Sequence, residues 1–459
     1  MKAFELEGPD AQAATQPPAP RIDQPENSAE MAEVYWMALL RDVNFIDYGT
    51  GANTDTGANT TADAVASLNN DFSDFRGPKQ GGAVTPGTLF RGFTPGDLTG
   101  PYVSQFLLAG NADAALGLGP QDGFIKYGTL LIDQRQKTAQ AGVDYLTRYE
   151  AFFPGASAPP NWLAAQNGFD YSDTDVFDPN RLFIRNLRDL VTYVHFDALY
   201  EAYLNACLIM LSLPVPFDPG NPYTDSINQD GFGTFGGPNI LSLVTEVATR
   251  ALKAVWYQKW GVHRRLRPEE FGGRIHVHLR GLPQQFFHPL VAPGRYPMID
   301  GEILNTAGGS VLDRIRAHNQ GNFGDDTFLL PMAFPEGCPT HPAYGAGHAT
   351  VGSACVTILK AWFDESFVLP FAFVPNAAGN ALQPAPGAPS LTVRGELDKL
   401  AANIALARNG AGVHWRSDYT ESTRLGEEIA IGILQEQRLL YNENFHFTVT
   451  RFDGTAVVI

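Results

Sequence analysis

The sequence predicts a mainly α-helical protein with two four-helix-bundle-like cores, long loops and a small C-terminal β-hairpin. Three observations support this fold class. Long segments in the second half of the chain repeat apolar residues at the spacing of a helix face. The stretches between them are rich in glycine and proline, which favour irregular connections. The C-terminal end alternates around Asp453-Gly454, and an Asp-Gly pair between alternating segments is typical of a hairpin turn.

Apolar spacing also places the individual helices. They are expected at 30–42, 182–213 as one long helix or two stacked ones, 240–266, 347–363, 393–408 and 417–441. The 347–363 segment is apolar nearly all round, as in a helix that is buried on every side. We expect Pro268 and Gly272-Gly273 to end the helix before them. Residues 76–180 should be mostly loops with short helical pieces such as 101–109.

The chain is expected to form an N-terminal arm, residues 1–28, and one large domain, residues 29–459. The arm is rich in proline, alanine and glutamine. Hydrophobic residues make up 44% of the chain of 459 residues, which is enough to bury a large core. The functional site is expected within about 182–445, because the unusual motifs described below fall there.

Charge and cysteine content exclude several classes of protein. Lys and Arg total 32 against 49 Asp and Glu, so a formal net charge of −17 argues against nucleic acid and anionic membranes as partners. No stretch reaches the roughly 18 apolar residues of a membrane span, and the N-terminus lacks the apolar core of a signal peptide. We expect a soluble protein, either cytoplasmic or exported. Three cysteines without a C-x-x-C pair exclude a disulfide framework and a cysteine-rich zinc site.

Two segments of this acidic chain gather positive charge and a possible anion site. Lys259 and Arg267 stand a little over two turns apart at the end of the 240–266 helix, so both can share one face. A Gly-rich turn leads into the 347–363 helix, where the backbone N–H of Gly347 can bind an anion that His348 also faces. In isolation, the first segment is also typical of a solvated basic helix end, and the second of a helix cap or a surface histidine.

A third segment combines Arg408, His414 and Asp418. Asp418 lies one turn after His414 and can hold its Nδ1 proton, which leaves Nε2 as a nucleophile or ligand. Alone, this segment also fits an ordinary surface turn. Together, the three segments supply the lysine, arginines and histidines that suit a tetrahedral oxyanion such as phosphate or vanadate. Because buried, unpaired positive charges are costly, an anion must complete such a site.

The order Lys-x7-Arg-Pro, Pro-x4-Gly-His and Arg-x5-His resembles that of the vanadium haloperoxidases and the related acid phosphatases. The runs LSLVTEVATRALKAVWYQKWGVHRRLRPE, HPAYGAGHATVGSACVTILKAWF and NIALARNGAGVHWRSDY look closest to algal and cyanobacterial bromoperoxidases. AEVYWMALLRDV near the N-terminus is similar to the same group. The resemblance extends over most of residues 30–445.

The resemblance implies vanadate as the cofactor, with His414 as the ligand of vanadium. The residues matching those that hold the vanadate oxygens are Lys259, Arg267, Gly347 and Arg408, with His348 as the acid–base group beside the apical oxygen. His341 matches an extra histidine typical of bromoperoxidases, and Trp256 a position that lines the halide pocket. Asp197 matches, more loosely, a buried aspartate that pairs with the site arginines.

One position departs from the family pattern. Where the family usually has serine before the Gly-His pair, this chain has Ala346. The missing hydroxyl removes a charge-assisted hydrogen bond worth about 1.5–3 kcal/mol. Vanadate affinity is therefore expected to fall roughly tenfold to a hundredfold.

The implied reaction is oxidation of bromide by hydrogen peroxide to hypobromous acid, which halogenates an organic acceptor. The resemblance also implies a homo-oligomer, a dimer or larger. Two alternatives stay open: an acid phosphatase with His414 as nucleophile, and a non-enzymatic oxyanion-binding or structural oligomer. His341 and the long WYQKWGVHRRLRPE match favour the peroxidase. The halide preference is not determined.

Two further groups of residues suggest metal binding only weakly. Asp225, Gln229 and Asp230 lie in a loop that suits either a structural Ca²⁺ or no ligand at all, since the EF-hand pattern is absent. His276 and His278 alternate without a third ligand, and we interpret them as structural residues and not as zinc ligands.

Overall fold

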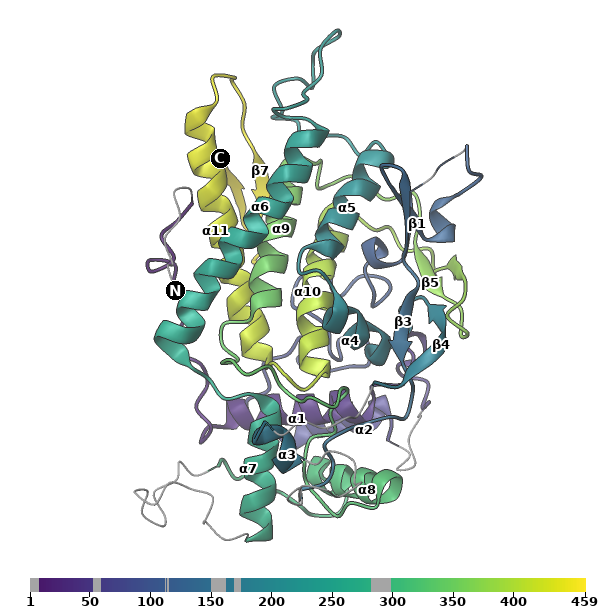
Figure 1. The fold of residues 1–459 in the computed structure, drawn as a ribbon, viewed down its shortest axis with the longest axis vertical. Coiled ribbons are helices and arrows are strands. Elements are labelled where there is room, and N and C mark those ends of the chain that lie inside the picture. The colour runs from purple at the N-terminus through teal and green to yellow at the C-terminus, as the bar shows by residue number, and fades with distance from the viewer. Residues whose placement is uncertain are drawn as a thin grey trace.

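The computed structural model describes residues 8–52, 59–111, 113, 115–149, 162–168, 175–281 and 299–459. Helices dominate these residues, and the strands form small antiparallel pairs, so the mainly α fold class is confirmed (Figure 1). The expected C-terminal hairpin is present as β7 (Thr448–Thr450) and β8 (Ala456–Val458). Within the described ranges, no helix is long and apolar enough to cross a membrane.

The helices are α1 (Pro25–Leu39), α2 (Thr61–Asn70), α3 (Trp162–Gln166), α4 (Leu187–Phe196), α5 (Glu201–Ser212), α6 (Gly237–Trp256), α7 (Pro268–Arg280), α8 (Val311–Phe323), α9 (Gly347–Trp362), α10 (Val393–Gly410) and α11 (Arg416–Leu440). The other strands are β1 (Phe124–Tyr127), β2 (Leu130–Asp133), β3 (Gln136–Ala139), β4 (Phe177–Leu182), β5 (Phe373–Pro375) and β6 (Leu382–Pro384). They pair β1 with β2, β3 with β4, and β5 with β6.

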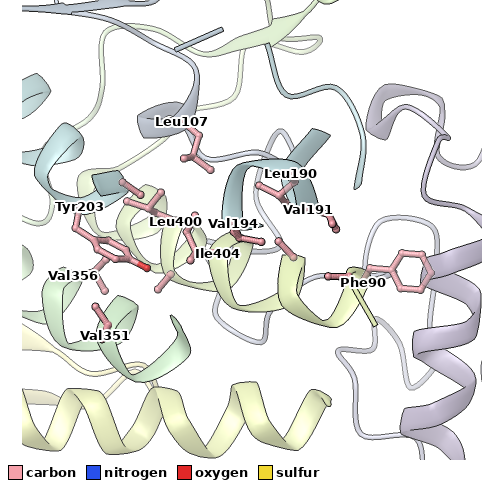
Figure 2. Close-up of a cluster of buried hydrophobic side chains, with 14 of the residues drawn as sticks. Phe90, Leu107, Leu190, Val191, Val194, Tyr203, Val351, Val356, Leu400 and Ile404 are labelled. Atoms are coloured by element: carbon pink, nitrogen blue, oxygen red, sulfur yellow. The ribbon is translucent and has the colours of Figure 1, made fainter. Parts of the chain in front are cut away.

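Helix α9 lies at the centre of the larger helical group. It packs against α6, α10 and α11, and more lightly against α5 (Figure 1). Every residue of α9 after its first two is buried, as its uniformly apolar sequence predicts. Figure 2 shows Tyr203 of α5 lying beside Val351 and Val356 of α9 and Leu400 of α10. The site residues at the start of α9 therefore stand on a rigid support.

A smaller helical group lies across one end of this bundle. In it, α1 packs against α2, α7 and α8, and α1 also contacts α10 of the larger group (Figure 1). The two groups correspond to the two helical cores that the sequence predicts. Helix α1 begins before the expected end of the arm at residue 28. The division into arm and domain stays a prediction.

Pro268 and Gly272-Gly273 do not end a helix, contrary to expectation. The preceding helix ends at Trp256 and continues as a π-helical turn, Tyr257–His263. Pro268 then begins α7, because its missing N–H costs nothing in the first turn of a helix. Glycine is required at position 273 inside α7 because the Trp162 ring packs directly against the helix there. A Cβ atom on residue 273 would lie 2.1 Å from Trp162 Cζ2.

Other boundaries also differ from expectation. The 182–213 segment is two helices, α4 and α5, separated by the short turn that contains Asp197. The 101–109 piece is helical only as a 3₁₀ turn at Gln105–Leu107. Helices α9, α10 and α11 begin and end within two residues of the expected positions. The sequence thus locates the long buried helices better than the short surface turns.

A buried network of ion pairs contacts the C-terminal end of α10. Arg41, just after α1, donates to the carbonyl oxygens of Gly410 at 3.2 Å and Pro331 at 2.9 Å. Its guanidinium forms an ion pair with Asp144, whose carboxylate also lies 3.1 Å from Arg188 Nη2. Burial alone would raise the pKa of Asp144, but the two arginines hold it well below its usual range.

We predict that Asp144→Asn lowers the free energy of unfolding by about 3–5 kcal/mol, because it leaves two arginines buried without a full counter-charge. Urea unfolding should detect the loss. The matched control is Glu246→Gln, which removes an exposed pair with Arg250 and should change stability by less than about 0.5 kcal/mol. Equal stability of both variants would contradict a structural role for the network.

Candidate active site

The three charged segments of the sequence converge at one end of the larger bundle. Lys259 lies in the π-helical turn after α6, and Arg267 is the residue before α7. The two do not share a helix face, as the sequence suggested, because the chain turns away at Arg264, whose φ is 51°. They nevertheless come together, since Lys259 Nζ and Arg267 Nη2 both donate to Pro342 O, at 2.7 Å and 3.3 Å. Arg408 approaches from the last turn of α10.

Backbone carbonyls, and not carboxylates, hold these cations in place. Lys259 Nζ donates to Pro342 O at 2.7 Å. Arg267 donates through Nε to His341 O at 2.8 Å and through Nη1 to Val413 O at 2.7 Å. Arg408 Nη1 donates to Val194 O at 3.1 Å. Neutral acceptors orient the side chains but leave their positive charge uncompensated.

Burial and the crowding of like charges lower the pKa values of the site cations. Burial, and then the charge of Arg267, lowers the pKa of Lys259 to about 7. Burial and Arg267 likewise lower the pKa of Arg408 to about 10. In the described part of the chain, the buried Nε of Arg408 has no hydrogen-bond partner. An oxyanion would supply both the missing acceptor and the missing negative charge, so these residues fit vanadate.

The His414 ring lies between this group of cations and Asp418, which orients it. Its Nδ1 lies 2.8 Å from Asp418 Oδ2, and its Nε2 lies 3.4 Å from Arg267 Nη1. Asp418 is itself held by the backbone N–H of Trp415 at 3.1 Å and by Arg265 at 2.8 Å. Burial and the nearby cations lower the pKa of His414 well below its usual value. A neutral ring that donates through Nδ1 presents the Nε2 lone pair to a metal.

The start of α9 forms the remaining side of the site. Gly347 and His348 occupy its first turn, where backbone N–H groups have no partner within the helix. His348 Nε2 lies 3.2 Å from Asp197 Oδ1. Asp197 therefore pairs with this histidine, whereas the sequence suggested a pairing with arginines. Its charge still reaches Arg408, whose pKa it raises against the lowering caused by burial.

Ala346 is the residue immediately before α9. Its backbone N–H donates to Ser422 Oγ at 2.8 Å, and its methyl group joins a small apolar cluster with Ala402 and Ala405 of α10. No side-chain hydrogen bond caps the helix at this position. Substitution by serine would thus add a hydroxyl at the helix start, beside Gly347.

A cavity of about 320 Å³, here called the site cavity, reaches Asp197, His348 and Arg408. Its walls also include four residues that the sequence analysis missed: His195, Phe334, Glu336 and Cys338. His195 Nε2 lies 3.2 Å from Glu336 Oε1, and its ring stacks on Phe334 at 3.7 Å. These residues come from separate segments, and no motif in the sequence marks them.

Two expected pocket residues lie near the site without lining this cavity. His341 is exposed, and its Nδ1 lies 3.0 Å from Arg267 Nη2. Partial burial, and then the charges of Lys259 and Arg267, lower its pKa to about 4. Trp256 is half-buried in the last turn of α6, packed against the core. The structure thus places His341 beside Arg267, and Trp256 at the end of α6, directly before the turn that carries Lys259.

The possible metal ligands outside the site lie in two separate parts of the chain. Asp225, Gln229 and Asp230 are all exposed, and in the described part of the chain no group of three or more His, Cys, Asp or Glu residues could hold a metal ion. A calcium site there stays a prediction. His276 accepts a hydrogen bond from the backbone N–H of Phe328 at 3.2 Å, which agrees with a structural interpretation.

Comparisons with known proteins agree with this geometry. A family model described as the VCPO second helical-bundle domain matches residues 317–443. The vanadium-dependent bromoperoxidase of Corallina pilulifera is 44% identical, over 99% of this chain and 78% of that protein. Those of Corallina officinalis and Ascophyllum nodosum are 42% and 32% identical, again over 99% of this chain, and over 78% and 75% of theirs.

A solved structure extends the similarity to the fold. The homohexameric structure of the second vanadate-dependent bromoperoxidase from Ascophyllum nodosum matches with a TM-score of 0.82 and 29% identity. The match covers 99% of this chain and 74% of that one. Because curated relatives at 32% to 44% identity also align over nearly its whole length, the chain belongs to the family of vanadium-dependent bromoperoxidases.

Proposed function

We propose that this chain is a vanadium-dependent bromoperoxidase, which oxidises bromide with hydrogen peroxide to hypobromous acid and so halogenates organic acceptors. One observation supports this most directly. Lys259, Arg267 and Arg408 are buried together and held by carbonyl oxygens, with no carboxylate in direct ion-pair contact among the described residues, and His414 presents Nε2 toward them. Such a site binds an oxyanion and offers it one nitrogen ligand.

The residues have distinct parts in the proposed function. His414 would bind vanadium, while Lys259, Arg267, Arg408 and the backbone N–H of Gly347 would hold the oxyanion. Vanadate, when bound, supplies a Lewis acid that activates hydrogen peroxide. His348 moves a proton at the substrate side, because its ring lines the site cavity and is oriented by Asp197. The preorganised cations stabilise developing negative charge without reorganisation.

His341 and Trp256 have more peripheral parts in this proposal. His341 lies beside Arg267 at the exposed edge, where it can contact peroxide or halide entering the site. Trp256 supports the π-helical turn that presents Lys259. We also infer that the chain assembles as a homo-oligomer, since its structural relative from Ascophyllum nodosum is a homohexamer.

The function is tested by bromination of a phenol dye with peroxide, before and after vanadate is added to chelator-treated protein. Wild type should gain activity on addition of vanadate. His414→Ala should remain inactive yet fold and still bind vanadate weakly, because the cations that attract the oxyanion are unchanged. Full bromination by His414→Ala would exclude it as the vanadium ligand. Hydrolysis of a phosphate ester without any bromination would instead support the acid phosphatase.

Vanadate binding at pH 8 should be accompanied by proton uptake. With a pKa of about 7, Lys259 is mostly neutral at that pH in the vanadate-free protein. A bound anion raises this pKa, so the amine takes up as much as about one proton. Calorimetry in two buffers of different ionisation enthalpy measures the uptake. Lys259→Arg keeps the charge in both states and should show less uptake, whereas equal uptake would contradict the prediction.

Ala346→Ser should tighten vanadate binding by about 1–2 kcal/mol, because it adds a hydroxyl donor next to Gly347. Titration of chelator-treated protein with vanadate measures the affinity. Serine in this position can also cap α9, which would stabilise the fold by about 1 kcal/mol with no anion present. Thermal unfolding without vanadate separates the two effects. A gain in stability with unchanged affinity would mean that the hydroxyl caps the helix and does not face the anion.

A further inference from the structure

Asp197 lines two cavities. On one side it lines the site cavity together with His348 and Arg408. On the other it lines a second cavity of about 410 Å³, here called the outer cavity. The side chain itself is only 4% exposed, so it separates the two spaces instead of standing free in either. A carboxylate in this position can accept a proton from one cavity and pass it to the other.

The outer cavity has its own buried polar groups next to Asp197. Glu201, at the start of α5, lines it, as do Tyr193 of α4 and Asn205 of α5. Burial raises the pKa of Glu201, the hydrogen bond from the Ala198 N–H partly offsets this, and the charge of Asp197 adds a smaller increase. Glu201 and Asp197 both act on the Tyr193 hydroxyl, which has no hydrogen-bond partner within the described residues. A buried polar group of this kind needs a partner, and water in a cavity can supply one.

The proposed reaction requires a supply of protons. Hydrogen peroxide, bromide and one proton give hypobromous acid and water: the O–O bond breaks, an O–Br bond forms, bromide loses two electrons and peroxide gains them. Each turnover therefore removes a proton from the site. Substrates and product occupy the site cavity, so a second entrance for protons would avoid competition with them.

We propose that Glu201 and Tyr193 deliver protons from the outer cavity to Asp197, which passes them to His348. Glu201, in its protonated form, gives its proton through Tyr193 and water to Asp197. Asp197 transfers it to His348 Nε2, across 3.2 Å, while the ring releases the proton on its Nδ1 to the reacting atoms, and exchange between the two tautomers of the neutral ring restores the Nδ1 proton before the next turnover. Solvent in the outer cavity then reprotonates Glu201. Glu201 and Tyr193 are thus positioning residues for proton transfer, and this role depends on the proposed function.

Other charged groups face the relay and set its working range. They are His348 from α9, Arg408 from α10, Lys137 from β3, Arg181 from β4 and Asp133 from β2, with Asp175 before β4. Arg408 lines the site cavity together with Asp197, and Glu201 lines the outer cavity with it. Because burial raises the pKa of Glu201, its protonated form persists to a higher pH than that of an exposed glutamate.

The first test compares bromination by wild type, Glu201→Gln and Tyr193→Phe with vanadate bound. Both variants should lose roughly tenfold in kcat above neutral pH, where protons are scarce, with unchanged KM for bromide and peroxide. Small weak acids such as imidazolium should restore the rate, since the outer cavity admits them. Tyr193→Phe removes a buried hydroxyl without a partner and should not reduce stability. Glu246→Gln, exposed on α6, is the matched control and should behave as wild type.

A second measurement uses the vanadate-free protein and does not depend on activity. Infrared spectroscopy should show a protonated carboxyl band that is absent from Glu201→Gln. In Asp197→Asn, this band should disappear at lower pH, because the neighbouring negative charge is gone. Two results would overturn the relay. One is a Glu201 carboxyl that titrates identically with and without Asp197, and the other is a wild-type rate in Glu201→Gln at every pH. Absence of bromination in wild type would instead mean that the proposed function is wrong.

Discussion

The active site depends on positive charges that are buried beside one another and that, among the described residues, are held by carbonyl oxygens and not by direct ion pairs. Three cationic side chains are oriented by carbonyl oxygens of neighbouring segments, chiefly Pro342, Val413 and Val194. Such an arrangement is unfavourable in the free protein, because each cation loses water and repels the others. The rest of the molecule must therefore be rigid enough to prevent the side chains from turning outward to solvent.

That rigidity comes from the packing around α9 and from ion pairs behind the site. Helix α9 is buried against α6, α10 and α11, and each of these helices ends or begins at a site segment. The nearby carboxylates contact the site histidines and not the cations themselves: Asp418 orients His414, and Asp197 orients His348. Arg41 ties the end of α10 to the loop at Pro331. Negative charge thus orients the histidines while the centre remains positive.

The same layout supports the proposed supply of protons from outside the group of cations. The site cavity, at His348 and Arg408, is distinct from the outer cavity, at Glu201. Among the described residues that line them, Asp197 alone lines both. Because burial and then the neighbouring cations lower the pKa values of Lys259 and His414, these groups are less protonated than usual in the vanadate-free protein and have fewer protons to supply. A donor outside the group of cations avoids that constraint, because negative neighbours favour its protonated form.

The sequence by itself determined the long buried helices, the three charged segments and, through resemblance, the family. Apolar periodicity is local, so α9, α10 and α11 could be located within two residues, and motif order specified which of Lys259, Arg267, Arg408 and His414 belong together. Only the tertiary structure decided that Pro268 begins a helix, that Asp197 pairs with His348, and that His195, Phe334 and Glu336 line the cavity. These contacts join residues from distant segments, and no spacing along the chain encodes them. Their geometry is set by how the helices pack.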